Sequence, residues 1–137
     1  MHGVIYGDFL AHLIVRLDLL LAIRPETYAR RVEVSNRKSA SSRRAVILTT
    51  SPGGGTGDTV RTSYVTVDVI ADDEGDTVDL MNLVLALAAS RGTGSMVDGR
   101  PILHLEVNGG PNADPAADGY YKQTAQLEVR HRGRNLT

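Results

Sequence analysis

The amino-acid sequence predicts an α+β domain, in which two helices pack on a mainly antiparallel sheet in the order α-β-β-β-α-β-β. Two segments have the 3.6-residue hydrophobic period of amphipathic helices, whereas several others are β-branched or alternate between apolar and polar residues, as half-buried strands do. The longer strands follow one another as hairpins, which favours antiparallel pairing. We expect residues 1–137 to form a single domain, because this length suffices for one hydrophobic core.

The first helix is predicted within residues 6–25. Asp8 can cap its N-terminus, and Pro25 disfavours helix beyond Arg24. One helical stripe collects the apolar residues Leu10, Leu13, Ile14, Leu17 and Leu21. A short strand is expected at residues 28–35, and a basic linker follows at residues 36–42.

Residues 43–71 are predicted to form a β-hairpin. The segment RRAVILTT at residues 43–50 is rich in β-branched residues, and in residues 60–71 Val65, Val67 and Val69 alternate with polar residues. Between these segments lies SPGGGTGD, whose glycine content is typical of a phosphate-binding loop. Such a loop needs a helix after it and usually Lys followed by Ser or Thr, but here Asp58 and Thr59 follow the last glycine and a strand comes next. We therefore expect a mobile hairpin tip formed by Gly53, Gly54, Gly55 and Gly57.

A second helix is predicted after this hairpin. Asp76 can cap it with Asp79 three residues on, and Arg91 and Gly92 close it. Its apolar stripe comprises Leu80, Leu83, Val84 and Leu87.

Two final strands are expected at residues 100–110 and 120–131, joined by the loop PNADPAADG at residues 111–119. Ala125, Leu127 and Val129 alternate with polar residues, which predicts a sheet with one buried face. The basic segment RHRGR at residues 130–134 is interpreted as a frayed tail.

Composition excludes several classes of function. The net charge of −1 gives no bulk attraction to DNA or to an anionic membrane, and the longest apolar run is far shorter than a bilayer span. The sequence lacks the pattern of a secretion signal, so we expect the protein to stay in the compartment where it is made. With no cysteine, neither disulfides nor thiolate metal sites can form.

No catalytic, cofactor-binding or metal-binding residues are predicted. No two of the four histidines have the i, i+4 helical spacing or the i, i+2 strand spacing of a metal site. The acidic run DDEGDTVD begins like a calcium loop, but Thr77 occupies the position that needs glycine and Leu83 the position that needs a bidentate Glu. The residues alone therefore favour a non-catalytic assembly or binding module.

Charge is divided between two clusters along the chain. The basic cluster comprises Arg30, Arg31, Arg37, Lys38, Arg43 and Arg44. The acidic cluster comprises Asp68, Asp72, Asp73, Glu74, Asp76 and Asp79. Both could be solvated loops, or they could pair across a subunit boundary. In the second case Arg43 or Arg44 would face Asp72, Asp73 or Glu74 of the next subunit, with pairing inside one hairpin as the competing explanation.

Three segments carry a resemblance to a known family. They are HGVIYGD before the first helix, VTVDVIADDEGDTVDLMNLVLALA between strand and helix, and HLEVNGGPNADPAADGYYKQTAQLEVR near the end. Together with the length and element order, they resemble the tail terminator proteins of long-tailed, siphovirus-type bacteriophages of actinobacteria. The resemblance extends over nearly the whole chain, and residues 30–59 match least.

The resemblance implies a non-enzymatic virion protein that needs no cofactor and assembles in the host cytoplasm. Such a subunit forms a ring, expected to be a hexamer, on the head-proximal end of the tail tube, where it stops tube growth and contacts the head connector. Its partners would be itself, the tail tube protein and the connector, with DNA only as the passing genome and no membrane. The alternatives are another head-to-tail joining or tail-tube subunit, or a small ligand-binding domain that uses the glycine-rich loop. The expected assembly-interface residues are Arg43, Arg44, Gly53, Gly54, Gly55, Gly57, Asp72, Asp73 and Glu74.

Overall fold

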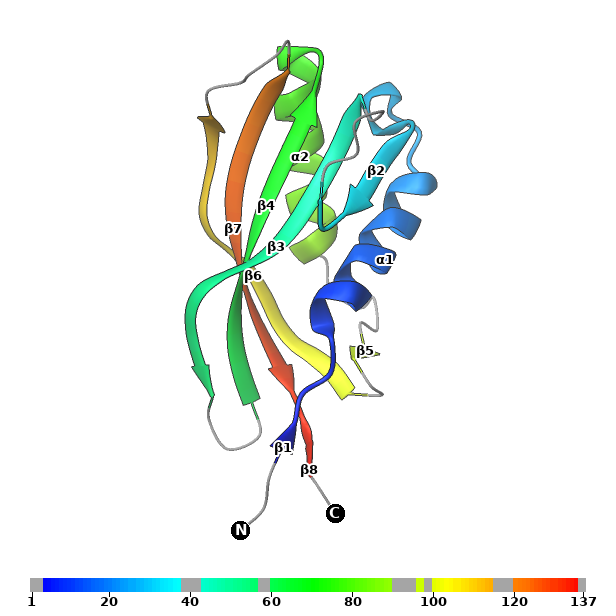
Figure 1. Cartoon of the computed structure of the whole chain (residues 1–137). Coiled ribbons are helices and arrows are strands. Elements are labelled where there is room, and N and C mark those ends of the chain that lie inside the picture. Colours follow the sequence, from blue (N-terminus) through cyan, green and yellow to red (C-terminus); the bar gives the residue numbers. More distant parts are fainter. Residues whose placement is uncertain are drawn as a thin grey trace.

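The computed structural model describes residues 4–37, 43–56, 60–89, 96–97, 100–114 and 120–135, and it confirms the expected α+β class (Figure 1). Its helices are α1 (Phe9–Ala22), the 3₁₀ helix η1 (Thr27–Ala29) and α2 (Glu74–Ala89). Its strands are β1 (Val4–Ile5), β2 (Val32–Ser35), β3 (Arg44–Thr56), β4 (Val60–Ala71), β5 (Met96–Val97), β6 (Arg100–Asp114), β7 (Tyr121–Arg132) and β8 (Arg134–Asn135). None of the helices in these ranges is long and apolar enough to cross a membrane.

The main sheet of the described chain has the strand order β2-β3-β4-β7-β6-β5. Strands β3, β4, β7 and β6 pair antiparallel with their neighbours, as expected, whereas β2 runs parallel to β3 with Val32 opposite Arg44. A separate pair joins β1 to β8 and brings the two ends of the described chain together at one end of the molecule (Figure 1). The expectation of a frayed tail is therefore wrong, because Arg130 to Arg132 belong to β7 and Arg134 to β8.

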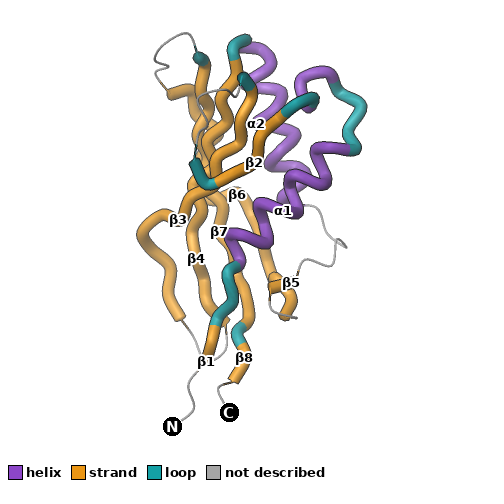
Figure 2. The backbone as a smooth tube through the Cα atoms, turned by 45° about the vertical axis from the view of Figure 1, so that its right-hand side comes forward, coloured by secondary structure: helices purple, strands orange, loops and turns teal. Residues whose placement is uncertain are grey.

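Both helices lie against the same face of the sheet (Figure 2). The alternation that predicted a buried face is confirmed, since Val65, Val67, Val69, Leu127 and Val129 are fully buried. From the helices, the residues that close this core are Phe9, Leu13, Leu17, Leu21, Leu80, Met81, Val84 and Leu85. The opposite face carries no helix of the described chain, and we call it the open face.

Helix α1 begins as predicted, because the Asp8 carboxylate accepts a hydrogen bond from the Ala11 backbone N–H at 3.0 Å. The predicted cap of α2 is wrong by one turn. Asp73 caps this helix and accepts from the Asp76 N–H at 2.9 Å, while the Thr77 hydroxyl donates to the Asp73 carbonyl at 2.7 Å. The spacing from Asp73 to Asp76 equals that from Asp76 to Asp79, so both Asp73 and Asp76 are candidate caps in the sequence. Capping by Asp73 makes the helix one turn longer. The predicted end at Arg91 and Gly92 lies outside the described residues.

The hairpin of β3 and β4 is confirmed, but three of its glycines lie in a strand rather than in the turn. Gly53, Gly54 and Gly55 belong to β3, where the register shifts between Ser51 and Gly55. Gly53 and Gly54 have φ of +118° and +82°, and a Cβ on Gly54 would lie 2.1 Å from the Thr62 carbonyl oxygen. Glycine is thus required by a bulge. Gly57, with the rest of the connection at residues 57–59, lies outside the described residues.

Strand β6 continues to Asp114, four residues beyond its predicted end, so half of the expected loop at residues 111–119 is strand. Its register against β7 shifts between Val107 and Gly109 and again before Asn112. From His104 to Val107 the register is regular. Here Leu105 pairs with Val129, and Glu106 pairs with Glu128. This register places Glu106 and Glu128 on the open face, because their neighbours Leu105 and Val129 pack into the core.

Candidate functional site

Arg44, one of the expected interface residues, uses its guanidinium group within its own chain. Nη1 donates to the backbone carbonyls of Thr27 at 2.9 Å and Arg30 at 3.0 Å. Nη2 donates to Oδ2 of Asp76 at 3.3 Å. The side chain thereby joins β3 to η1 and to the first turn of α2, and its acidic partner is Asp76 rather than Asp72, Asp73 or Glu74.

The remaining charged interface candidates lie at the same end of the hairpin. Ala45 pairs with Ile70, which places the start of β3 beside the end of β4 in one chain. Arg43, Asp72 and Glu74 are exposed there. Asp73 is exposed as well, but its carboxylate and carbonyl serve the N-terminus of α2. One member of each charge cluster, Arg44 and Asp76, thus pairs inside one subunit, and a contact of Arg43 with a neighbouring subunit stays a prediction.

An apolar stripe on the outer side of α1 was missed by the sequence analysis. Val15, Leu19 and Ile23 are 58%, 64% and 78% exposed. Val15 and Leu19 lie in α1 and Ile23 is its C-cap residue, and their spacing of four residues places them on one side, away from the core residues Leu13 and Leu17. The i, i+4 spacing of these three residues is present in the sequence and is the signal from which the stripe could be predicted. We call Val15, Leu19 and Ile23 the α1 stripe.

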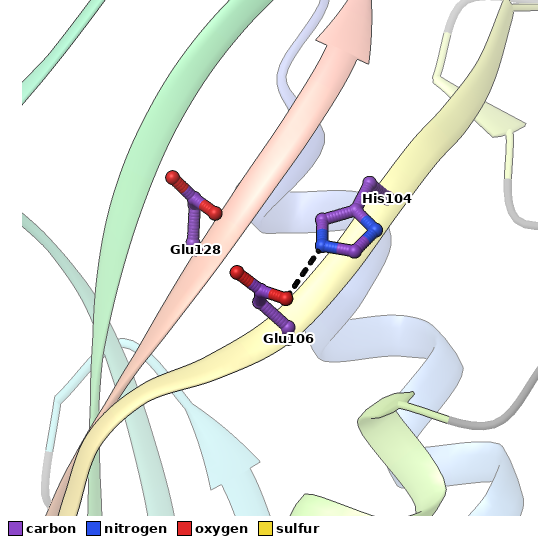
Figure 3. Close-up of side chains that lie close together, drawn as sticks. All are labelled: His104, Glu106 and Glu128. Atoms are coloured by element: carbon purple, nitrogen blue, oxygen red, sulfur yellow. Dashed lines mark ion pairs between the residues drawn. The ribbon is translucent and has the colours of Figure 1, made fainter.

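Three potential metal ligands meet on the open face, His104 and Glu106 from β6 and Glu128 from β7 (Figure 3). One ligand atom from each lies within 4.8 Å of the others, and this is the only such group that the described residues form. Nε2 of His104 lies 2.9 Å from Oε2 of Glu106. The side chains of His104 and Glu106 are 41% and 53% exposed, and that of Glu128 only 13%.

The electrostatics of this cluster are dominated by its two carboxylates. The hydrogen bond from His104, assisted by one with Glu128, holds the pKa of Glu106 below its ordinary value. Glu106 and Glu128 stand directly opposite each other, an arrangement that disfavours two like charges. Apart from the imidazole, the ion-pair partner that the described residues offer this group is Arg130, whose Nη2 is 4.0 Å from Oε2 of Glu128.

A second carboxylate pair on the same face shows how the fold neutralises such charges. Lys122 lies between Asp114 and Asp68, with Nζ at 3.2 Å and 3.9 Å from their carboxylates. The Thr124 hydroxyl lies within hydrogen-bonding distance of both, 2.8 Å from Asp68 and 3.4 Å from Asp114. The ammonium group of Lys122 therefore balances the negative charges of this pair.

His131 is the one fully buried histidine of the described chain. Its ring stacks on Phe9 at a centroid distance of 4.5 Å and meets the Tyr6 ring edge-on at 5.6 Å, while Nε2 lies 3.2 Å from the Ser63 hydroxyl. Burial, together with the charge of Arg61, holds the pKa of His131 below its ordinary value. These contacts fit a structural role in the core near the chain termini.

The sequence predicted no metal-binding residues, because no two histidines have the spacing of a metal site. The cluster instead combines one histidine with two glutamates. The pattern His-x-Glu at residues 104–106 was the available signal, but the third ligand becomes a neighbour only through the register of β6 and β7. Comparison of the sequence with family models and with curated proteins gives no match, so the family resemblance stays an expectation.

Proposed function

We propose that the protein is a tail terminator of a long-tailed bacteriophage, a non-enzymatic subunit that forms a ring on the head-proximal end of the tail tube. The observation that carries the proposal is the confirmed fold, in which the resembling segments fall on connected elements. Of the described residues in these segments, 4–8 lead into α1, 65–88 join β4 to α2, and 104–114 and 120–130 lie in or beside β6 and β7. In the virion, this ring ends tube growth and contacts the head connector.

A ring needs a surface at which copies meet, and the α1 stripe supports this requirement. Three exposed apolar side chains in a row, two on α1 and one at its C-cap, are unfavourable in water and typical of an association surface. Since Arg44 is bound within its own chain, the α1 stripe is a better place than Arg44 to test assembly. We propose that a second copy of the chain covers the α1 stripe. This proposal depends on ring formation and is wrong if no ring forms.

The function is tested by adding the purified protein to growing tail tubes of the same phage. We expect a ring at one end of each tube by electron microscopy, and tubes that stop lengthening. A tail-tube subunit would itself polymerise into tubes, and another joining protein would bind finished tails without stopping growth. A protein that neither binds tube ends nor limits their length would overturn the proposal.

The assembly surface is tested by Leu19→Asp, with Val78→Asp on α2 as the matched control, because Val78 is also exposed but lies outside the α1 stripe. Leu19→Asp should abolish ring formation on tube ends, whereas Val78→Asp should not. Both variants should unfold at the denaturant concentration of the wild-type protein, because neither side chain is in the core. Normal rings from Leu19→Asp would exclude the α1 stripe without excluding the function.

A further inference from the structure

The cluster of His104, Glu106 and Glu128 has the donor atoms and the spacing of a divalent-cation site. It offers one imidazole nitrogen and two carboxylate oxygens, all within 4.8 Å of one another. All three residues lie on adjacent paired strands, which fix their Cα positions. We propose that this cluster binds a divalent cation of the zinc class.

The comparison with Lys122 supports a cation at this place. Glu106 and Glu128 face each other on the neighbouring strands β6 and β7, whereas Asp68 on β4 and Asp114 on β6 lie on either side of β7. Between Asp68 and Asp114, β7 supplies the ammonium group of Lys122, but beside Glu106 the fold supplies the imidazole of His104, which is a metal ligand when neutral. Arg130 reaches only the margin of the group, at 4.0 Å from Glu128. A bound cation would balance the charges of Glu106 and Glu128, as the Lys122 ammonium group balances those of Asp68 and Asp114.

The donor set favours zinc over magnesium or calcium. Imidazole together with carboxylate oxygens suits zinc, whereas magnesium and calcium prefer oxygen ligands alone. Zinc would bind between Nε2 of His104 and Oε2 of Glu106, which are already 2.9 Å apart. The side chains of His104 and Glu106 are 41% and 53% exposed, so an ion about 2.0–2.2 Å from each donor could reach them from solvent. Three protein ligands leave a fourth position for water.

The test is calorimetric titration of the full, untagged chain with zinc chloride, and separately with magnesium chloride. His104→Gln and Glu106→Gln each remove one ligand. The matched controls are His12→Gln and Asp18→Asn on α1, which remove the same kinds of group from another surface. We expect one zinc per wild-type chain, a Kd raised roughly tenfold or more by each ligand variant, and little change in the controls. Thermal unfolding in EDTA checks that all variants are folded.

Three results would overturn the proposal. The wild-type chain takes up no zinc at roughly 1 mM zinc chloride, the ligand variants bind zinc with the wild-type Kd, or magnesium binds as tightly as zinc. NMR of the wild-type chain tests the site without any substitution, so it still applies if a ligand variant fails to fold. In the wild-type chain, zinc should shift the ring NMR signals of His104 and leave those of the buried His131 in place. Shifts at His131 without shifts at His104 would place the metal elsewhere and refute the site.

Discussion

Replacing Arg44 with Met separates an intrachain role from an interface role. Met keeps an apolar stem in the same place but removes every donor. Arg44 makes two hydrogen bonds to backbone carbonyls and one to Asp76, with its side chain 26% exposed. A hydrogen bond from a charged donor contributes about 1.5 kcal/mol at the low end of its range, and partial exposure lowers that to roughly 1 kcal/mol each. The ion pair adds about 0.5 kcal/mol.

Arg44→Met should therefore lower the free energy of unfolding by about 2 to 2.5 kcal/mol. Asp76→Asn loses the ion pair and the interaction of the carboxylate with the N-terminus of α2, so it should cost about 1 kcal/mol. Arg44→Lys keeps the charge but not the planar fork that reaches two carbonyls, so it should recover less than half of the loss. Arg43→Met is the control, because Arg43 is exposed one residue earlier and should change stability by less than about 0.5 kcal/mol.

The assay is urea unfolding of dilute protein followed by circular dichroism, with self-association measured in parallel. The double variant Arg44→Met with Asp76→Asn completes a cycle whose coupling energy should be about 0.2–1 kcal/mol. The reasoning is refuted if Arg44→Met leaves unfolding within about 0.3 kcal/mol of the wild-type value and abolishes self-association. In that case Arg44 acts between subunits, and its intrachain contacts contribute nothing measurable.

Two further predictions concern the bulge and the buried histidine. Gly54→Ala should lower the free energy of unfolding by about 2 kcal/mol or more, because a side chain there meets the Thr62 carbonyl at positive φ, whereas Gly55→Ala, with nothing within 4 Å of its Cβ, should cost much less in the same urea assay. The lowered pKa of His131 means that the unfolded chain binds this proton more tightly, so the free energy of unfolding should fall as the pH drops below about 6.5, by at most about 1.36 kcal/mol per pH unit. His131→Gln should reduce that slope, and an unchanged slope would show that His131 does not cause it.

Periodicity within one segment was enough to predict most of the core. Val65, Val67 and Val69 alternate in the sequence and are buried in the structure, because the pleat of a strand makes every second residue face the same way. The Asp8 cap of α1 was likewise predicted from residues close together in the sequence. Where two local signals competed, the sequence could not choose, and Asp73 displaced Asp76 as the cap of α2.

Features that depend on pairing between distant strands were beyond the sequence. The glycines of β3 were assigned to a turn, since only the register against β4 shows that Gly54 lies beside the Thr62 carbonyl. Similarly, the residue that completes the histidine cluster is 22 positions from Glu106, and only the pairing of β6 with β7 makes Glu128 its neighbour. The pair of β1 and β8 is two residues long on each side, too short to produce a periodic signal.

The two proposals concern different faces of the molecule and can fail separately. The α1 stripe lies on the outer side of a helix that covers one face of the sheet, whereas Glu106 and Glu128 alternate with core residues and so project from the other face. A change at Leu19 therefore leaves the cation ligands untouched, and a change at Glu106 leaves α1 untouched. Zinc binding by Leu19→Asp should equal that of the wild-type chain. Loss of zinc binding in this variant, with its fold intact, would show that the cation site needs a second subunit to be complete.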